Sequence, residues 1–191
     1  MIEVVDFSKT NSVINLYMSE LRDKNYQKNR LLFRHNIKRV GEMMAYELSK
    51  TLEYRPKTIT TPLGTIDIQL PKEDLLIATV LRAGLPFHEG FINVFDHADN
   101  AFVSAYRMYT NREHTEVGVH TEYLAAPSAK GKTLVIVDPM PAVALRCGLI
   151  GRCLRHGLGC DLNCFIALVG YGNVLSCKHR RGVLKQHRYH R

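Results

Sequence analysis

Two short apolar runs constrain the fold of this chain more than any other feature. Leu75–Leu81 is an almost continuous apolar run that contains Ile77 and Val80, and Thr133–Val137 is a second run, which ends before Asp138. The length and composition of the first run are typical of a strand that is covered on both faces, and the second run predicts a further strand. Since buried strands that alternate with helices form mainly parallel sheets, the runs predict an α/β fold.

Two helices are indicated around the first of these runs. Apolar residues spaced three or four apart predict one face of an amphipathic helix, which Pro56 ends or follows in a loop. A second, short helix is expected from Pro86, because proline suits the first helical turn. The apolar face of the first helix consists of Phe33, Ile37, Val40, Met44 and Leu48.

Three further strands complete the expected pattern of residues 1–140. Ile66, Ile68 and Leu70 alternate with polar residues, which predicts a half-buried strand. Two more strands are expected at Ala101–Tyr106 and Val117–Tyr123, joined by the polar segment Met108–Glu116.

Polar or small residues follow three of the predicted strands. They are Arg82-Ala83-Gly84, then Arg107, then Asp138-Pro139-Met140. Ligands of mainly parallel sheets bind at the carboxyl edge, where the strands end. Arginine offers a fixed fork of donors that fits phosphate oxygens, and small residues let backbone N–H groups approach a diphosphate. The sequence therefore predicts a polyanion site, with surface arginines and a simple Asp-Pro turn as the alternative interpretation.

The other polar side chains of this part have ordinary structural interpretations. No serine or cysteine nucleophile is legible beside a histidine in residues 1–140, so His88, His97, His114 and His120 are expected to be solvated or structural. Glu113 and Glu116 are expected to be solvated charges of a loop.

Several motifs resemble the uracil phosphoribosyltransferase family in order and approximate spacing. They are LLIATVLRAGLPFHEG, AYR, EY and GKTLVIVDPM, preceded by an RDKN…R…AYEL segment that is similar to the family's first long helix. The resemblance covers about residues 15–140. It implies a type I phosphoribosyltransferase fold, with a mainly parallel sheet flanked by helices.

The resemblance also implies a reaction: uracil and 5-phosphoribosyl 1-diphosphate give UMP and diphosphate, a step of pyrimidine salvage. Arg82 and Arg107 match family residues that hold the diphosphate substrate, and Asp138 matches the acidic residue that opens the ribose 5′-phosphate loop. Ala83, Gly84, Pro139 and Met140 would support these loops.

The resemblance further implies Mg²⁺, which would be carried mainly by the diphosphate, as its chemistry favours. It also implies a homo-oligomer. No catalytic nucleophile is assigned, because catalysis would come from positioning and from stabilising the leaving group.

The resemblance stops after Met140. Family members continue with Leu-Ala-Thr-Gly-Gly-Ser, a glycine-rich anion cradle, where this chain reads Pro141-Ala142-Val143-Ala144-Leu145-Arg146-Cys147-Gly148. Nothing in residues 148–191 matches the family's Pro-Gly-Leu-Gly-Asp-Ala motif, which reads the uracil edge, and the chain is shorter than is usual for the family. The C-terminal part is therefore expected to be atypical or incomplete, and the enzyme impaired.

A change of composition coincides with this break. Residues 1–140 carry 17 basic and 17 acidic residues, whereas residues 141–191 carry nine basic residues and one acid, Asp161. All five cysteines and seven of the 13 glycines also fall in residues 141–191. We expect a phosphoribosyltransferase-like core at 1–140 and a basic, Cys/Gly-rich tail at 141–191. The coincidence suggests that the tail is translated out of frame. For the function of the whole protein, the alternatives to a uracil phosphoribosyltransferase are a catalytically inactive relative of the family and, less favoured, an RNA-binding protein that uses the basic tail.

Other functions of the tail fit its sequence less well. The spacing C-x₅-C-x₆-C-x₃-C-x₁₂-C contains no C-x₂-C pair for zinc, and disulfides are not expected in the cytoplasm. The basic end, residues 178–191, lacks interleaved aromatic residues and is typical of a disordered charged segment rather than of a nucleic-acid partner site. No apolar run approaches the roughly 20 residues that span a bilayer, and no secretory signal is visible, so a cytoplasmic protein without a membrane partner is expected.

Overall fold

The computed structural model describes residues 3–109, 117–139, 164–169 and 174–179. Its elements are β1 (Glu3–Asp6), η1 (Phe7–Lys9), α1 (Ile14–Arg22), η2 (Tyr26–Lys28), α2 (Arg30–Ser49), β2 (Tyr54–Thr61), β3 (Gly64–Pro71), β4 (Leu75–Leu81), α3 (Leu85–Ile92), β5 (Asp99–Tyr109), β6 (Val117–Ala125), β7 (Thr133–Asp138), β8 (Cys164–Val169) and β9 (Val174–His179).

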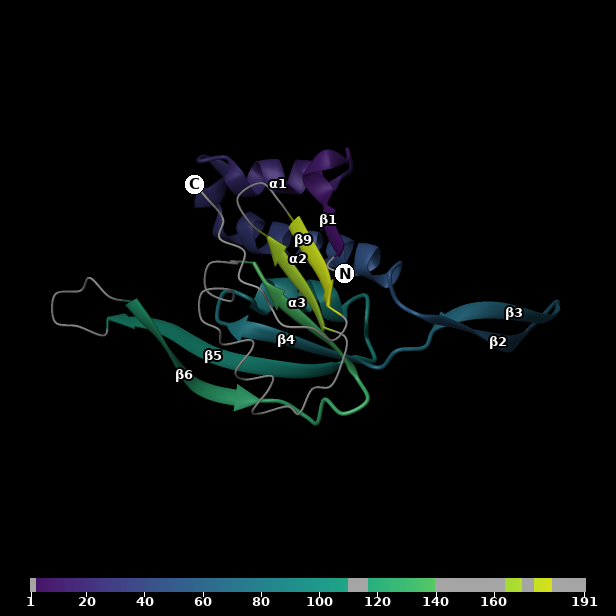
Figure 1. Ribbon diagram of the computed structural model, residues 1–191. Helices are drawn as coiled ribbons and strands as arrows, with labels where there is room; N and C mark the ends of the chain where they lie inside the picture. The colour runs from purple at the N-terminus through teal and green to yellow at the C-terminus, as the bar shows by residue number, and fades with distance from the viewer. Residues whose placement is uncertain (1–2, 110–116, 140–163, 170–173, 180–191) are drawn as a thin grey trace.

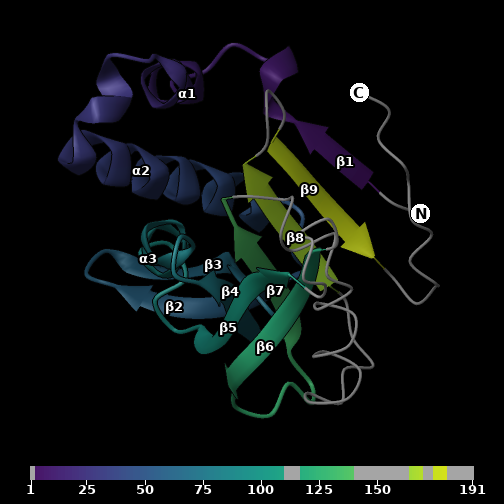
Figure 2. The ribbon, with the colours of Figure 1, turned by 90° about the vertical axis from the view of Figure 1, so that its left-hand side faces the viewer.

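Seven strands form the central sheet, in the order β1-β9-β8-β7-β4-β5-β6. The four inner strands β8, β7, β4 and β5 run parallel, whereas β6, β9 and β1 pair antiparallel with their neighbours. The helices α1, α2 and α3 lie on one face of this sheet (Figure 2). The α/β fold with a mainly parallel inner sheet is thus confirmed.

The two apolar runs form the centre of the core, as the composition of the first one predicts. On β4, Leu75 and Ile77 face the cluster made with the helices, and Leu76 and Ala78 belong to a cluster on the opposite face. This alternation is the normal geometry of a strand, and it explains why a strand buried on both faces needs an unbroken apolar run. The strand β7 is likewise buried at each of its six residues.

Two glycines allow α2 and α3 to pack closely on this face. A Cβ atom on Gly90 would lie 2.2 Å from the carbonyl oxygen of Lys38 and 3.0 Å from the Cα atom of Gly41. A Cβ atom on Gly41 would lie 2.6 Å from the carbonyl oxygen of Phe87. Since all three neighbours are backbone atoms, the crossing of the helices depends on residues without side chains.

The strands β2 and β3 form a separate two-stranded ribbon that extends away from the body of the molecule (Figure 1). The strand predicted around Ile66–Leu70 is therefore present as β3, but the expectation that it is half-buried is wrong, because Ile66 and Ile68 are exposed. The assignment of Pro56 is also wrong. The helix α2 ends at Ser49, and Pro56 lies within β2 opposite Gln69, where a ribbon outside the main sheet tolerates its missing N–H.

Two segments of the tail belong to the central sheet. The strand β8 pairs parallel with β7, and β9 pairs with both β8 and β1. Lys178 and His179 are the last residues of β9, so the expectation of a disordered end is wrong for these two. The rest of that basic segment lies outside the described residues. No helix in the described part of the chain is long and apolar enough to cross a membrane.

Candidate functional site

The carboxyl ends of β4 and β7 lie side by side in the sheet, because Thr79 of β4 is the parallel register partner of Val137 of β7. Arg82 is the first residue after β4, and Asp138 is the last residue of β7. The structure thus brings two of the predicted site residues to the same edge on adjacent strands. Arg82 is exposed, whereas Asp138 is only 3% exposed.

The turn from β4 into α3 is short and closely packed. The Leu81–Arg82 peptide bond is cis, the Gly84 amide donates to the Val80 carbonyl at 3.2 Å, and the Leu85 amide donates to the Arg82 carbonyl at 3.3 Å. A Cβ atom on Gly84 would lie 2.0 Å from Thr79 Oγ1, so no larger residue fits there unless its neighbours move. Gly84 also precedes the first residue of α3, so the positive end of the helix dipole lies beside the exposed Ala83.

Arg107 lies inside β5 rather than after it, so this part of the prediction is wrong. Leu81 of β4 pairs with Ser104, and β5 continues to Tyr109 because β6 remains its antiparallel partner. Arg107, opposite Val119 in that pairing, is therefore three residues beyond the level at which β4 ends. The predicted site residues consequently come from the three neighbouring strands β7, β4 and β5. Pro139 is a buried bend residue, and Met140 lies outside the described residues.

Thr79 is a buried polar residue at this edge that the sequence pattern did not single out. Its side chain is 1% exposed, and Oγ1 donates to the carbonyl oxygen of Val137 at 2.9 Å. The sequence signal for this residue is a threonine inside an otherwise apolar run. A buried hydroxyl there requires a hydrogen-bond partner, but the run does not identify that partner.

His88 is structural, as expected. It is 4% exposed on α3, and its Nε2 atom lies 2.8 Å from Asn100 Oδ1. Burial lowers the pKa of His88, and the hydrogen bond with Asn100 offsets part of that effect. His97 is almost fully exposed, as a solvated residue would be. His120 lies on β6, and His114, Glu113 and Glu116 lie outside the described residues.

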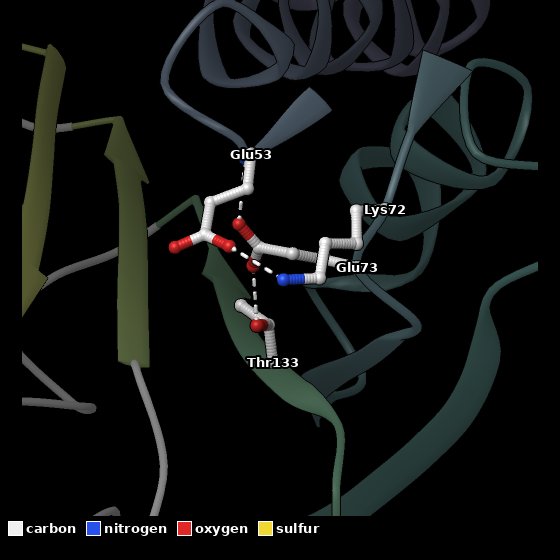
Figure 3. A network of polar contacts seen from close by, with 4 residues as sticks. All are labelled: Glu53, Lys72, Glu73 and Thr133. Carbon is white, nitrogen blue, oxygen red and sulfur yellow. Dashed lines mark hydrogen bonds and ion pairs between the residues drawn. The ribbon is translucent and has the colours of Figure 1, made fainter. Parts of the chain in front are cut away.

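A polar network lies at the opposite, amino-terminal end of β4 and β7 (Figure 3). The Glu73 carboxylate accepts hydrogen bonds from the Glu53 amide, at 2.9 Å, and from the Thr133 hydroxyl. Lys72 forms an ion pair with Glu53 at 3.3 Å. These contacts join the base of the β2–β3 ribbon to the first residue of β7, so the network supports the ribbon and lies away from the candidate site.

The described residues include no group of three or more His, Cys, Asp or Glu side chains that could hold a metal ion together. Asp138 is the acidic side chain that the structure brings to the candidate edge. A cation that keeps most of its ligands from a phosphorylated substrate and water, as Mg²⁺ does, is compatible with such a sparse set of protein donors.

Comparison with known proteins adds a finding that the geometry alone does not supply. The sequence matches the uracil phosphoribosyltransferase family over residues 8–156. The chain belongs to this family. The matched range begins before and ends after the range 15–140 that the motifs indicated, and it extends past Met140. The type I phosphoribosyltransferase fold expected from the resemblance is thereby confirmed.

Individual relatives agree with the family assignment. A uracil phosphoribosyltransferase from Porphyromonas gingivalis is 49% identical over 140 residues, which cover 73% of this chain and 64% of the relative. One from Methanothermobacter thermautotrophicus is 34% identical over 128 residues, 65% of this chain and 58% of the relative. The chain therefore spans somewhat less than two thirds of the length of these relatives.

The fold also resembles a solved structure, the AQ2163 protein from Aquifex aeolicus. The TM-score is 0.65 at 26% sequence identity, over 83% of this chain and 73% of that one. Because the match covers most of both chains, it extends the likeness from the motifs to the architecture.

Proposed function

We propose that the protein is a uracil phosphoribosyltransferase, a glycosyltransferase that converts uracil and 5-phosphoribosyl 1-diphosphate to UMP and diphosphate in pyrimidine salvage. The observation that carries the proposal is the family match over residues 8–156, which includes the Arg82 turn and the end of β7. The adjacency of Arg82 and Asp138 at one sheet edge supports it, because this edge is where such sheets bind ligands.

The roles of the residues follow from the charges that the reaction moves. The uracil N1–C1′ bond forms as the bond from C1′ to the diphosphate oxygen breaks, and the N1 proton of uracil passes to water or to the departing diphosphate. Arg82 and Arg107 hold the diphosphate, and the backbone at Ala83 and Gly84 approaches it closely. Asp138, with Pro139 and Met140, holds the ribose part. Catalysis then consists of positioning the reactants and stabilising the departing anion, without a protein nucleophile.

Mg²⁺ fits this scheme as a cation carried mainly by the diphosphate and by water, with Asp138 as a carboxylate that the described residues bring to the proposed site. When bound, it neutralises charge that develops on the leaving diphosphate. The chain's own contribution is the arginine fork, whose planar donors match two phosphate oxygens at once.

The test is UMP formation from labelled uracil with 5-phosphoribosyl 1-diphosphate and Mg²⁺, in the chain and in an Arg82→Ala variant. We expect the variant to lose at least roughly 100-fold of whatever UMP formation the chain shows, the effect typical of removing one preorganised donor. Arg34→Ala is the matched control, since Arg34 is an exposed arginine of α2. An Arg82→Ala variant as active as Arg34→Ala would overturn the assignment of Arg82.

A catalytically inactive relative is the second candidate, and one observation favours it. The chain reads Pro141–Gly148 where the family has its Thr-Gly-Gly-Ser cradle, so the backbone donors for the 5′-phosphate have no evident substitute. We propose that the chain as written is strongly impaired and that residues 141–191 are translated out of frame. UMP formation at an ordinary enzymatic rate, roughly 1–10³ per second, contradicts the impairment.

A homo-oligomer is part of the proposal. Support comes from the β2–β3 ribbon, whose register aligns Ile59 with Ile66 and Lys57 with Ile68 on one face. A two-stranded ribbon is marginally stable on its own, so the exposed isoleucines Ile66 and Ile68 on this face gain from being covered. Sedimentation equilibrium distinguishes an oligomer from a monomer, and a monomer at all accessible concentrations would contradict this part.

A further inference from the structure

We propose that the buried hydroxyl of Thr79 is a positioning group that holds the Arg82 turn and the Asp138 strand end at a fixed separation. The inference rests on the proposed phosphoribosyl diphosphate site. Within β4, Thr79 is the one polar side chain among seven residues. A buried hydroxyl costs free energy unless it is hydrogen-bonded, so its presence in the middle of the core requires an explanation.

The first contact of the hydroxyl is with β7. Oγ1 donates to the carbonyl oxygen of Val137 at 2.9 Å, within the core and across 58 positions of the sequence. That carbonyl belongs to the peptide unit that joins Val137 to Asp138. The bond therefore fixes the orientation of the peptide from which Asp138 continues into its loop.

The second contact of the hydroxyl is with the turn that carries Arg82. A Cβ atom built on Gly84 would lie 2.0 Å from Thr79 Oγ1 and 2.6 Å from the carbonyl oxygen of Val80. The backbone of Gly84 thus packs directly against the hydroxyl. The turn is closed by the hydrogen bonds from Gly84 to Val80 and from Leu85 to Arg82, so it rests on Thr79 as a compact unit.

One oxygen atom therefore contacts both loops to which the substrate would bind. The diphosphate at Arg82 and the ribose at Asp138 are parts of one molecule, so their affinity depends on the separation of the two loops. Valine at this position keeps the side-chain shape but replaces the hydroxyl with a methyl group. The Val137 carbonyl then loses the hydrogen bond from residue 79, and the larger methyl group crowds the backbone of Gly84. Serine keeps the donor and loses only a methyl group.

The experiment compares the full chain with Thr79→Ser, Thr79→Ala and Thr79→Val. Serine and alanine both lack the methyl group and differ only in the hydroxyl, so they remain informative if the valine variant does not fold. Thr133→Val is the matched control, because Thr133 is also a buried threonine with a bonded hydroxyl but lies at the other end of β7. Amide hydrogen exchange and binding of Mg²⁺–5-phosphoribosyl 1-diphosphate by calorimetry are measured for each.

We expect Thr79→Ala and Thr79→Val to exchange faster than Thr79→Ser both at residues 82–85 and at Asp138. We also expect them to bind the diphosphate substrate roughly tenfold more weakly than Thr79→Ser, the equivalent of about 1.4 kcal/mol. Thr133→Val is expected to lose stability without either change at the site.

Two results would overturn the inference. In the first, alanine and serine variants exchange alike at both loops. In the second, loss of the hydroxyl speeds amide exchange at only one of the two loops, which would show that Thr79 does not hold both. Failure of the unaltered chain to bind 5-phosphoribosyl 1-diphosphate counts against the proposed function instead, and the exchange comparison of alanine with serine still decides the role of Thr79.

Discussion

The imidazole of His88 lies between α3 and β5, with its ring 5.0 Å from the ring of Phe102. Asn100 Nδ2 donates to the Ala98 carbonyl at 3.4 Å, which turns its Oδ1 atom toward the imidazole. Nε2 therefore carries a proton and donates to Asn100 Oδ1. Burial makes the charged form costly, and this is the main reason that the pKa of His88 is lowered.

This pKa shift predicts that the protein loses stability on acidification. The unfolded chain takes up a proton at His88 near its ordinary pKa of about 6.5, whereas the folded chain does so only at lower pH. The contribution is thus complete above pH ~6.5 and is lost as the pH falls through the lowered pKa of the folded state, by at most about 1.4 kcal/mol per pH unit. Urea unfolding between pH 8 and pH 5 measures it.

His88→Gln removes the titrating group and keeps a donor for Asn100, so we expect its stability to fall less steeply below pH 6.5 than that of the original chain. His97→Gln is the matched substitution at an exposed histidine. Identical slopes for the original chain and His88→Gln would show that burial of this imidazole does not matter for stability.

At the same scale, the sequence predicts the type of site residue better than its exact setting. Arg82 and Asp138 follow apolar runs, and strand geometry brings such residues to one edge. Arg107 was misplaced because the end of β5 depends on pairing with β6, which no local pattern encodes. The role of Thr79 was missed because its partner carbonyl is 58 residues away.

Between elements, the crossing of α2 and α3 gives a sharp test of packing. Alanine in place of a helical glycine normally stabilises a helix by about 1 kcal/mol. In Gly90→Ala the new Cβ atom would meet the Lys38 carbonyl at 2.2 Å and the Glu42 amide at 2.9 Å. We expect a net loss of roughly 1–3 kcal/mol in the free energy of unfolding, as for other overpacked cores. Urea denaturation measures both its size and its sign.

The control for this prediction is Glu89→Ala, which removes the surface ion pair with Lys38 at 2.5 Å and adds no atom to the crossing. An exposed pair is worth about 0–1 kcal/mol, so the loss should be smaller. A stabilised Gly90→Ala variant would show that the helices separate at little cost.

The elements themselves were predictable to different degrees. The strand β4 and the helix α2 were found because apolar spacing encodes a buried face in each. The alternation in β3 correctly predicts a strand, but alternation indicates an apolar face and not what covers it, so it does not predict that the ribbon is exposed. In the tail, the apolar run Cys164–Val169 forms β8. The basic, Cys/Gly-rich composition of the tail as a whole does not indicate this strand.

For the whole molecule, the open question is how residues 1–140 relate to residues 141–191. The family match reaches residue 156, while charge balance and cysteine content change at residue 140. The pairing of β8 with β7 is compatible with a native tail and with a tail translated out of frame. An apolar run of this length suits an inner parallel strand in both cases. The nucleotide sequence across the junction distinguishes a native tail from one translated out of frame.

We expect an independent read of the gene across the codons for Val137–Gly148 to restore a Thr-Gly-Gly loop after Met140 and a different reading frame for the tail. The physical reason is that the 5′-phosphate needs backbone donors, which the glycine-rich loop provides and Pro141–Gly148 does not. Protein made from the restored frame should form UMP at least roughly 100-fold faster than the chain as written, since several anion contacts are regained. An unchanged read, together with equal activity of the chain and its family relatives, would mean that this tail binds the phosphate in its own way.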